Sequence, residues 1–131
     1  MDKIYFAHPV NTYNRPIELK ALELIAKTFP SLEIVNPNAP LHEAAYKKEG
    51  MAYFAKMVRE TSAMVILPFD DGSIGAGIAK EALESLVQGS PVFYFEPPSL
   101  SVRKLEGLSG LVILTIEQTR VRLKSGKEEY C

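Results

Sequence analysis

Ala-Met-Val-Ile-Leu-Pro-Phe-Asp-Asp-Gly-Ser-Ile-Gly-Ala-Gly-Ile-Ala-Lys-Glu-Ala-Leu-Glu-Ser-Leu, residues 63–86, is the stretch that decides the fold. Residues 63–67 are apolar throughout, as expected of a central parallel strand buried on both faces. A polar turn at residues 70–73 follows. Apolar residues then recur at helical spacing, at Ile78, Ala79, Ala82, Leu83 and Leu86. The stretch therefore predicts a strand, a turn and a helix.

The same alternation extends outward in both directions along the chain. Residues 3–7, 32–35 and 91–95 are short apolar runs that predict further strands, and 111–114 predicts a fifth. Pro16 marks the start of a first helix, and Met51, Phe54 and Val58 mark the inner face of a second. Near the end, Thr115 and Gln118 have the spacing of a capping box, which favours a last helix through Leu123. Residues 120–124 also alternate well enough to form a strand.

Alternating strands and helices need crossover connections, and right-handed crossovers build a doubly wound parallel sheet. We therefore expect an α/β protein: one flavodoxin-like (Rossmann-like) domain over residues 1–131, with a five-stranded parallel sheet of order 2-1-3-4-5 and helices on both faces. In that order the switch point lies between strands one and three. A ligand should bind over their carboxyl ends, near residues 8–14 and 70–77.

Composition limits the functional classes. The chain has 131 residues, 47% of them hydrophobic, and a formal charge of −1. This balance gives no general attraction to nucleic acid or to anionic lipid. The longest apolar runs are too short to span a bilayer, and the opening residues lack a signal-peptide layout. With a single cysteine, Cys131, no internal disulfide can form, so we expect a cytoplasmic protein.

The turn after the third predicted strand is the best candidate for a binding site. Gly72, Gly75 and Gly77 lack a Cβ, so backbone amides can approach a ligand oxygen closely, and the helix end adds positive partial charge. Ser73 can cap the helix or donate to the same oxygen. The turn therefore predicts contact with a phosphate, ribose or carboxylate. A plain turn with tightly packed glycines is the alternative.

Two runs of residues resemble the nucleoside 2-deoxyribosyltransferase-like superfamily. One is Lys-Ile-Tyr-Phe-Ala-His-Pro at 3–9, and the other is Val-Ile-Leu-Pro-Phe-Asp-Asp-Gly-Ser at 65–73, followed by a helix and Gly-Ser-Pro-Val at 89–92. The order of elements is similar over residues 3–95. In addition, residues 75–81 have the Gly-x-Gly-x-x-x-Glu spacing found in cytokinin-activating phosphoribohydrolases. The resemblance implies an enzyme that cleaves or transfers the N-glycosidic bond of a nucleoside or nucleotide. We expect no cofactor, and one cysteine with two histidines argues against a structural zinc site.

The resemblance also implies roles for individual residues. Glu81 becomes the nucleophile, or the anion that stabilises an oxocarbenium-like centre, because cleavage builds positive charge on the sugar. Tyr5 would position that carboxylate or the sugar. Asp71 and His8 are the nearest candidates by loop position for donating a proton to the departing base.

The chain also departs from the superfamily pattern. No acid follows Gly72 and Ser73 within residues 74–76, and residues 53–56 of the preceding helix carry none. On a helical wheel, Glu81 points away from Ile78, Ala82 and Leu86, as a solvated surface glutamate would. A nucleotide-binding protein without catalysis is therefore the alternative function.

Other polar residues are weaker candidates for ligand contacts. His8, Asn11 and Arg15 lie in or beside the first loop, and Asn36 ends the second strand, but such residues also form ordinary turns. His42 has no partner at metal-ligand spacing. Mg²⁺ bound by Asp70 and Asp71 through a phosphate is a weaker reading than a solvated turn.

We also expect a homodimer or a higher homo-oligomer. The second helix carries more large apolar groups than one inner stripe can bury, at Met51, Tyr53, Phe54 and Met57. Tyr46, Tyr53 and Phe54 are read as core or dimer contacts.

Two classes that share this fold fit poorly. A flavodoxin-like electron carrier would need a Ser/Thr/Gly-rich first loop, where this chain has Pro9, Tyr13 and Pro16, and a phosphoacceptor domain would need acids in place of Ala7 and His8.

Overall fold

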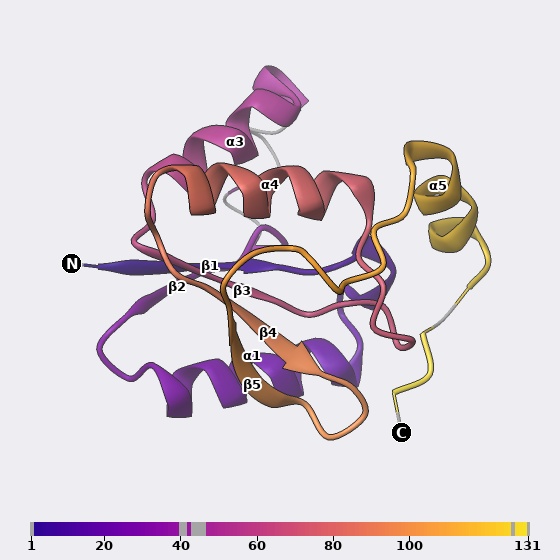
Figure 1. Cartoon of the computed structure of the whole chain (residues 1–131), viewed down its shortest axis with the longest axis horizontal. Coiled ribbons are helices and arrows are strands. Elements are labelled where there is room, and N and C mark those ends of the chain that lie inside the picture. Colours follow the sequence, from indigo (N-terminus) through magenta and orange to yellow (C-terminus); the bar gives the residue numbers. More distant parts are fainter. Residues whose placement is uncertain (1, 40–41, 43–46, 127, 131) are drawn as a thin grey trace.

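The computed structural model describes residues 2–39, 42, 47–126 and 128–130, and within them one five-stranded sheet is flanked by helices (Figure 1). The strands are β1 (Lys3–Ala7), β2 (Glu33–Val35), β3 (Ala63–Ile66), β4 (Val92–Glu96) and β5 (Ser101–Leu105). The helices are α1 (Pro16–Thr28), α3 (Met51–Arg59), α4 (Ala76–Val87) and α5 (Ile116–Lys124), with a short 3-10 helix, η1 (Val10–Thr12).

The strand order is β2-β1-β3-β4-β5, as the sequence predicted. β1 pairs in parallel with β2 on one side and β3 on the other, and β3 pairs in parallel with β4. Since the chain passes from β1 outward to β2 and then back to β3, the switch point falls between β1 and β3. The carboxyl ends of these strands therefore frame a crevice.

The expectation of a fully parallel sheet was wrong at its last strand. β5 is Ser101–Leu105 and runs antiparallel to β4. Four residues separate the two strands, and a parallel crossover needs about a dozen. Residues 111–114 are not a strand: Ile113 forms only an isolated parallel bridge with Ile74 in the turn before α4. The apolar run at residues 111–114 predicted a buried strand, but Val112 is largely exposed.

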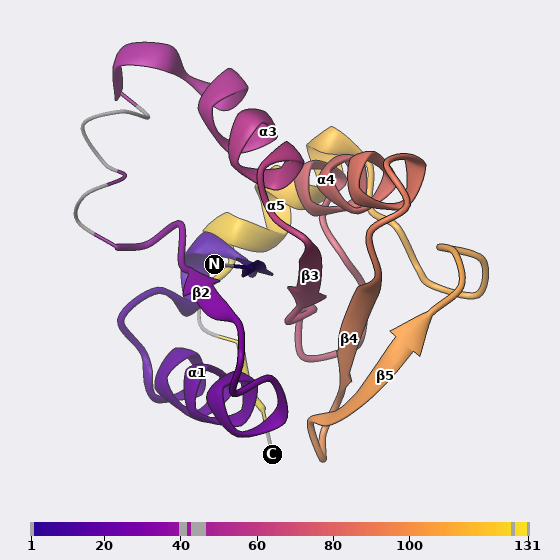
Figure 2. The same cartoon turned by 90° about the vertical axis from the view of Figure 1, so that its left-hand side faces the viewer.

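The helices cover the two faces of the sheet separately (Figure 2). Along β1, Ile4 and Phe6 face α1, whereas Tyr5 and Ala7 face α3 and α4. This alternation follows from the two-residue period of a strand, and both halves are apolar because both faces are covered. Tyr5, the candidate positioning residue, therefore lies on the face of the sheet that α3 and α4 cover.

α5 begins where the capping box placed it, and residues 120–124 belong to this helix rather than to a strand. The Thr115 hydroxyl accepts from the Gln118 amide, and the Gln118 side chain accepts from the Thr115 amide. None of the residues of α5 is buried. Contacts at its edge with the turn before α4 therefore hold it in place.

The large apolar groups of α3 are mostly used within the chain. Val58 is buried, Met57 packs on the core, and Phe54 faces a cavity described below. Tyr53 makes a short hydrogen bond with His42. Tyr46 and the side chain of Met51 lie outside the part of the chain that the structure describes. Of the α3 groups that suggested a subunit contact, Tyr53 and Met57 therefore have partners inside the protein.

Across the described part of the chain, every helix is too short or too polar to cross a bilayer.

Candidate functional site

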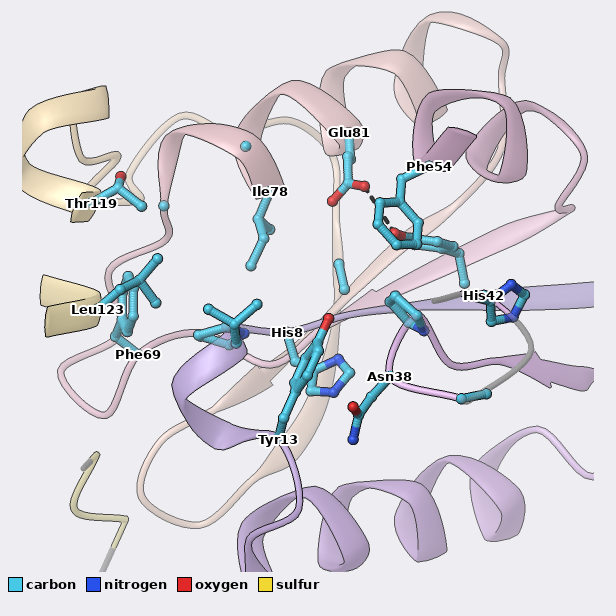
Figure 3. Close-up of a pocket in the computed structure, with 18 residues that line it drawn as sticks. His8, Tyr13, Asn38, His42, Phe54, Phe69, Ile78, Glu81, Thr119 and Leu123 are labelled. Atoms are coloured by element: carbon cyan, nitrogen blue, oxygen red, sulfur yellow. Dashed lines mark hydrogen bonds between the residues drawn. The ribbon is translucent and has the colours of Figure 1, made fainter. Parts of the chain in front are cut away.

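A cavity of about 600 Å³ opens over the carboxyl ends of β1, β2 and β3 (Figure 3). Segments distant in the sequence supply its walls: the loops after these strands, the start of α4, and parts of α3 and α5. The described residues that line it are Tyr5, Ala7, His8, Pro9, Val10, Tyr13, Pro37, Asn38, Ala39, His42, Phe54, Phe69, Gly75, Gly77, Ile78, Glu81, Thr119 and Leu123. The cavity lies at the switch point that the strand order predicted.

Tyr5 and Glu81 meet in this cavity although 76 positions separate them in the chain. The Tyr5 hydroxyl donates a hydrogen bond to Glu81 Oε2 at 2.9 Å. Tyr5 lies on β1 and is almost fully buried, with an exposed fraction of 2%. Glu81 is half-buried and faces the cavity from α4. A buried strand residue thus fixes the direction of a carboxylate that can reach a ligand.

The environment of this pair changes the acidity of both groups. Burial raises the pKa of Glu81 to about 7, and the hydrogen bond from Tyr5 opposes this rise. Burial raises the pKa of Tyr5 too, and the neighbouring Glu81 carboxylate raises it further. Near neutral pH the tyrosine therefore keeps its proton, and Glu81 is divided between its neutral and ionised forms.

The solvated position that the helical wheel suggested for Glu81 was wrong. α4 begins at Ala76, which places Glu81 in its second turn, on the side that faces β1 and the cavity. The wheel located the core from Ile78, Ala82 and Leu86 only. It therefore recognised only the side of α4 that packs on the sheet. α4 also borders a cavity, and Glu81 lies on that second side.

Gly75 and Gly77 line the cavity as expected, but the turn that they form is partly occupied by α5. The Ala76 amide donates to Thr119 Oγ1 at 3.0 Å. A Cβ on Gly75 would lie 2.9 Å from Thr119 Cγ2, closer than such atoms approach. The glycine is therefore needed for the contact with α5, whereas a Cβ on Gly77 would meet nothing within 4 Å.

Ser73 and Asp71 do not line the cavity, contrary to the prediction. Ser73 is buried, and its hydroxyl and amide both donate to Asp71 Oδ1, at 2.6 and 2.9 Å. Asp71 also pairs with Arg122 of α5 at 3.0 Å. Burial tends to raise the pKa of Asp71, but the bonds from Ser73 and Arg122 outweigh burial and lower it. Asp71 is thus an ionised surface group, not a proton donor in the cavity.

Arg122 connects Asp71 to a larger group of charges beside the cavity. It also pairs with Asp70 at 2.7 Å and with Glu128 at 2.8 Å, and it lies over the ring of Phe69. The side chain of Glu128 is only 3% exposed; burial tends to raise its pKa, but hydrogen bonds, those from Arg122 foremost, outweigh burial and lower it. Asp70 is therefore part of an ion-pair network rather than a magnesium site.

His8 does line the cavity, but its ring nitrogens are engaged by the protein. Nε2 lies 2.8 Å from Glu18 Oε2, and Nδ1 lies 3.1 Å from the Phe6 carbonyl oxygen. The ring also stacks on Phe6, with centroids 3.8 Å apart. His8 thus presents a ring edge and an apolar surface, and both of its nitrogens already face acceptors.

Asn11 and Asn36 are not among the residues that line the cavity. Asn11 donates to Glu128 and to the Gly126 carbonyl, which ties η1 to the C-terminal segment. Asn36 Oδ1 accepts from the Asn38 amide, an ordinary turn contact. Asn38 lines the cavity instead, and its side-chain amide donates to Glu18. The loop after β2 therefore contributes an asparagine to the cavity, but it is Asn38 rather than the predicted Asn36.

Lining residues that the sequence did not point to include three aromatic side chains and two residues of α5. Tyr13, Phe54 and Phe69 give the cavity flat apolar surfaces suited to an aromatic ring. Thr119 and Leu123 belong to α5, whose position no local pattern indicates. Arg15, named with Asn11, donates to the Asn11 carbonyl and does not line the cavity.

His42 also faces the cavity, and burial lowers its pKa. Among the residues that the structure describes, no group of three or more His, Cys, Asp or Glu side chains could hold a metal ion. Comparison of the chain with known proteins gave no significant match to a protein-family model, a curated protein or a solved structure. The site is therefore interpreted from its own chemistry.

Proposed function

We propose that the protein cleaves or transfers the N-glycosidic bond of a nucleoside or nucleotide, with Glu81 acting at the anomeric carbon. The observation that carries this proposal is the hydrogen bond between Tyr5 and Glu81 in a cavity with aromatic walls. The motif at residues 75–81 and its resemblance to N-glycosidic enzymes add to it. A carboxylate held in a fixed direction inside an aromatic cavity suits a sugar that carries an aromatic base.

The chemistry follows from the two groups. When ionised, Glu81 attacks the anomeric carbon as the N-glycosidic bond breaks, and the bonding electron pair leaves with the base, which takes up a proton from solvent. Water then attacks the same carbon, loses a proton to solvent and releases ionised Glu81, which gives hydrolysis. A second base in place of water gives transfer. Tyr5 keeps its proton throughout and holds the carboxylate in place.

One observation favours a second function, nucleotide binding without catalysis. Both groups that the sequence offered as proton donors are unsuited to the task. Asp71 is ionised and paired with Arg122, and both nitrogens of His8 face protein acceptors. A binding protein needs the cavity but no such donor.

Incubation with purine and pyrimidine nucleosides and their 5′-monophosphates, followed by chromatography of the free base, tests the proposal. We expect base release from at least one compound. Glu81→Gln should slow release at least ~100-fold, because an amide cannot attack the sugar. Glu84→Gln is the matched control: Glu84 lies on the same helix but pairs with Arg59 at the surface, at 3.5 Å.

The outcomes separate the two functions. Equal rates for wild type and Glu81→Gln would remove Glu81 from the mechanism. Binding by calorimetry without base release would favour the binding protein. Neither binding nor release across the panel would contradict both.

We further propose a flavodoxin-like fold, a cytoplasmic location and a homodimer. The strand order supports the first of these. Two exposed apolar residues one turn apart on α4, Leu83 and Val87, offer a surface for the homodimer contact.

A further inference from the structure

The amino-terminal end of α4 is the place in the cavity where a negatively charged substituent would ordinarily bind. Free backbone amides and the helix dipole make such an end attractive to phosphate. In this protein Thr119 of α5 occupies part of it. Its Oγ1 accepts from the Ala76 amide at 3.0 Å, and its methyl group packs against Gly75. Figure 3 places Thr119 beside the start of the helix that carries Ile78 and Glu81.

The hydrogen bonds of the Thr119 hydroxyl define its orientation. The hydroxyl donates its proton to the Thr115 carbonyl oxygen at 2.7 Å, one turn earlier in α5. A lone pair is therefore left for the Ala76 amide, and the two bonds are made together. Thr119 thus presents an oxygen, not a proton, toward the end of α4. An approaching phosphate oxygen would meet a second acceptor where it needs a donor.

The two Ser73 donors expected to bind a phosphate in this turn are also used by the protein. The hydroxyl and amide of Ser73 both bind Asp71. Among the described residues that line the cavity none is a lysine or an arginine, and Glu81 supplies a carboxylate. A dianionic substituent would therefore lose water without gaining a charged partner.

The position of the Ala76 amide and Thr119 matches a particular part of the substrate. Glu81 lies five residues after Ala76, about 7.5 Å along the helix axis. With the anomeric carbon at Glu81, the far side of the sugar, which carries the 5′ group, can extend toward Ala76 and Thr119.

We propose that Thr119 is a specificity-determining residue that excludes a 5′-phosphate, so that the cavity accepts an uncharged nucleoside in preference to its 5′-monophosphate. This inference rests on the proposed function and adds the substrate class to it. It assigns to α5 a role in selection, since Thr119 reaches the cavity from that helix.

Calorimetric titration of the purified protein with 2′-deoxyadenosine, 2′-deoxycytidine and their 5′-monophosphates tests the inference. The wild type should bind at least one nucleoside at least about tenfold more tightly than its monophosphate, because the phosphate is desolvated without a partner. Thr119→Ala removes the competing oxygen and frees the Ala76 amide. It should reduce the ratio of the dissociation constants of monophosphate and nucleoside at least about threefold. Thr119→Ser keeps the oxygen and is the control, with a ratio like that of the wild type.

Each outcome bears on a separate claim. Equal or tighter binding of the monophosphate by the wild type would overturn the role of Thr119, whatever the variants do. An unchanged ratio in a folded Thr119→Ala would overturn it as well. If bases are released but monophosphates are preferred, the proposed function stands and this inference fails. If no member of the wider nucleoside and nucleotide panel binds or reacts, the proposed function fails and this inference with it.

Discussion

Replacing Glu81 with glutamine should stabilise the protein at high pH, because the wild type loses stability when this half-buried carboxyl ionises. The pKa of Glu81 is about 7 in the folded protein, against an ordinary value of 4.5. Below pH 4.5 the group is protonated in both states. Between 4.5 and 7 the unfolded chain releases the proton while the folded protein keeps it, so raising the pH favours unfolding.

The size of the effect follows from this interval. At about 1.4 kcal/mol for each pH unit, the wild type should lose up to about 3 kcal/mol of its unfolding free energy as the pH rises from 4.5 to above 7. Glu81→Gln stays neutral and its amide oxygen can still accept the Tyr5 hydrogen bond. The stability difference between variant and wild type should therefore grow by that amount and then stay constant.

Urea denaturation of both proteins at several pH values from 4.5 to 8.5 measures this difference. Glu18, Asp71 and Glu128 have lowered pKa values and act in the opposite direction, but they are common to both proteins and cancel. Glu84→Gln should run parallel to the wild type. A difference between Glu81→Gln and wild type that does not change with pH would refute the reasoning, since it would mean that Glu81 ionises as it does in water.

Four further predictions concern the site and the elements around it. Tyr5→Phe removes a hydrogen bond that lowers the pKa of Glu81, so the midpoint of the rise in kcat/KM with pH should move above about 7; an unmoved midpoint would deny Tyr5 its positioning role. Gly75→Ala should cost about 1–3 kcal/mol of stability in urea denaturation, because the new Cβ meets Thr119 at 2.9 Å. Arg122→Gln should cost about 2 kcal/mol by leaving the buried Glu128 carboxylate without its arginine, whereas Arg103→Gln breaks an exposed pair and should cost less than about 1 kcal/mol; equal losses would contradict this account. Light scattering at micromolar concentration should report twice the mass of one chain, and a monomer would end the homodimer proposal.

The sequence was sufficient for the elements whose local pattern agrees with their final environment. Residues 63–66 are apolar at every position because both faces of β3 are covered, so the strand could be recognised without knowing its neighbours. The capping box at Thr115 specifies where α5 begins through bonds within four residues. The order of the first four strands followed from short crossovers of fixed handedness, and it located the cavity over the carboxyl ends of β1 and β3.

β5 escaped prediction because it lies at the sheet edge, with Ser101, Arg103 and Lys104 exposed, so apolar patterning hardly distinguishes it from a loop. The run at 111–114 misled because its apolar side chains are not buried between helices. A hydrophobic pattern reports burial only when another element covers it. In both cases the neighbouring element determined the outcome.

For the candidate site, the sequence by itself determined which loops meet and that His8, Gly75 and Gly77 lie there, whereas Tyr5 and Glu81 were named through a resemblance and the helical wheel placed Glu81 in solvent. Only the tertiary structure decided which of their polar atoms remain available to a ligand. Asp71, two positions away, occupies Ser73, and hydrogen bonds between residues far apart in the chain occupy Asp71 and the Ala76 amide and direct Glu81 inward. The physical reason is that a polar group's partner is whichever complementary group packing brings within about 3 Å, and spacing along the chain does not encode that distance.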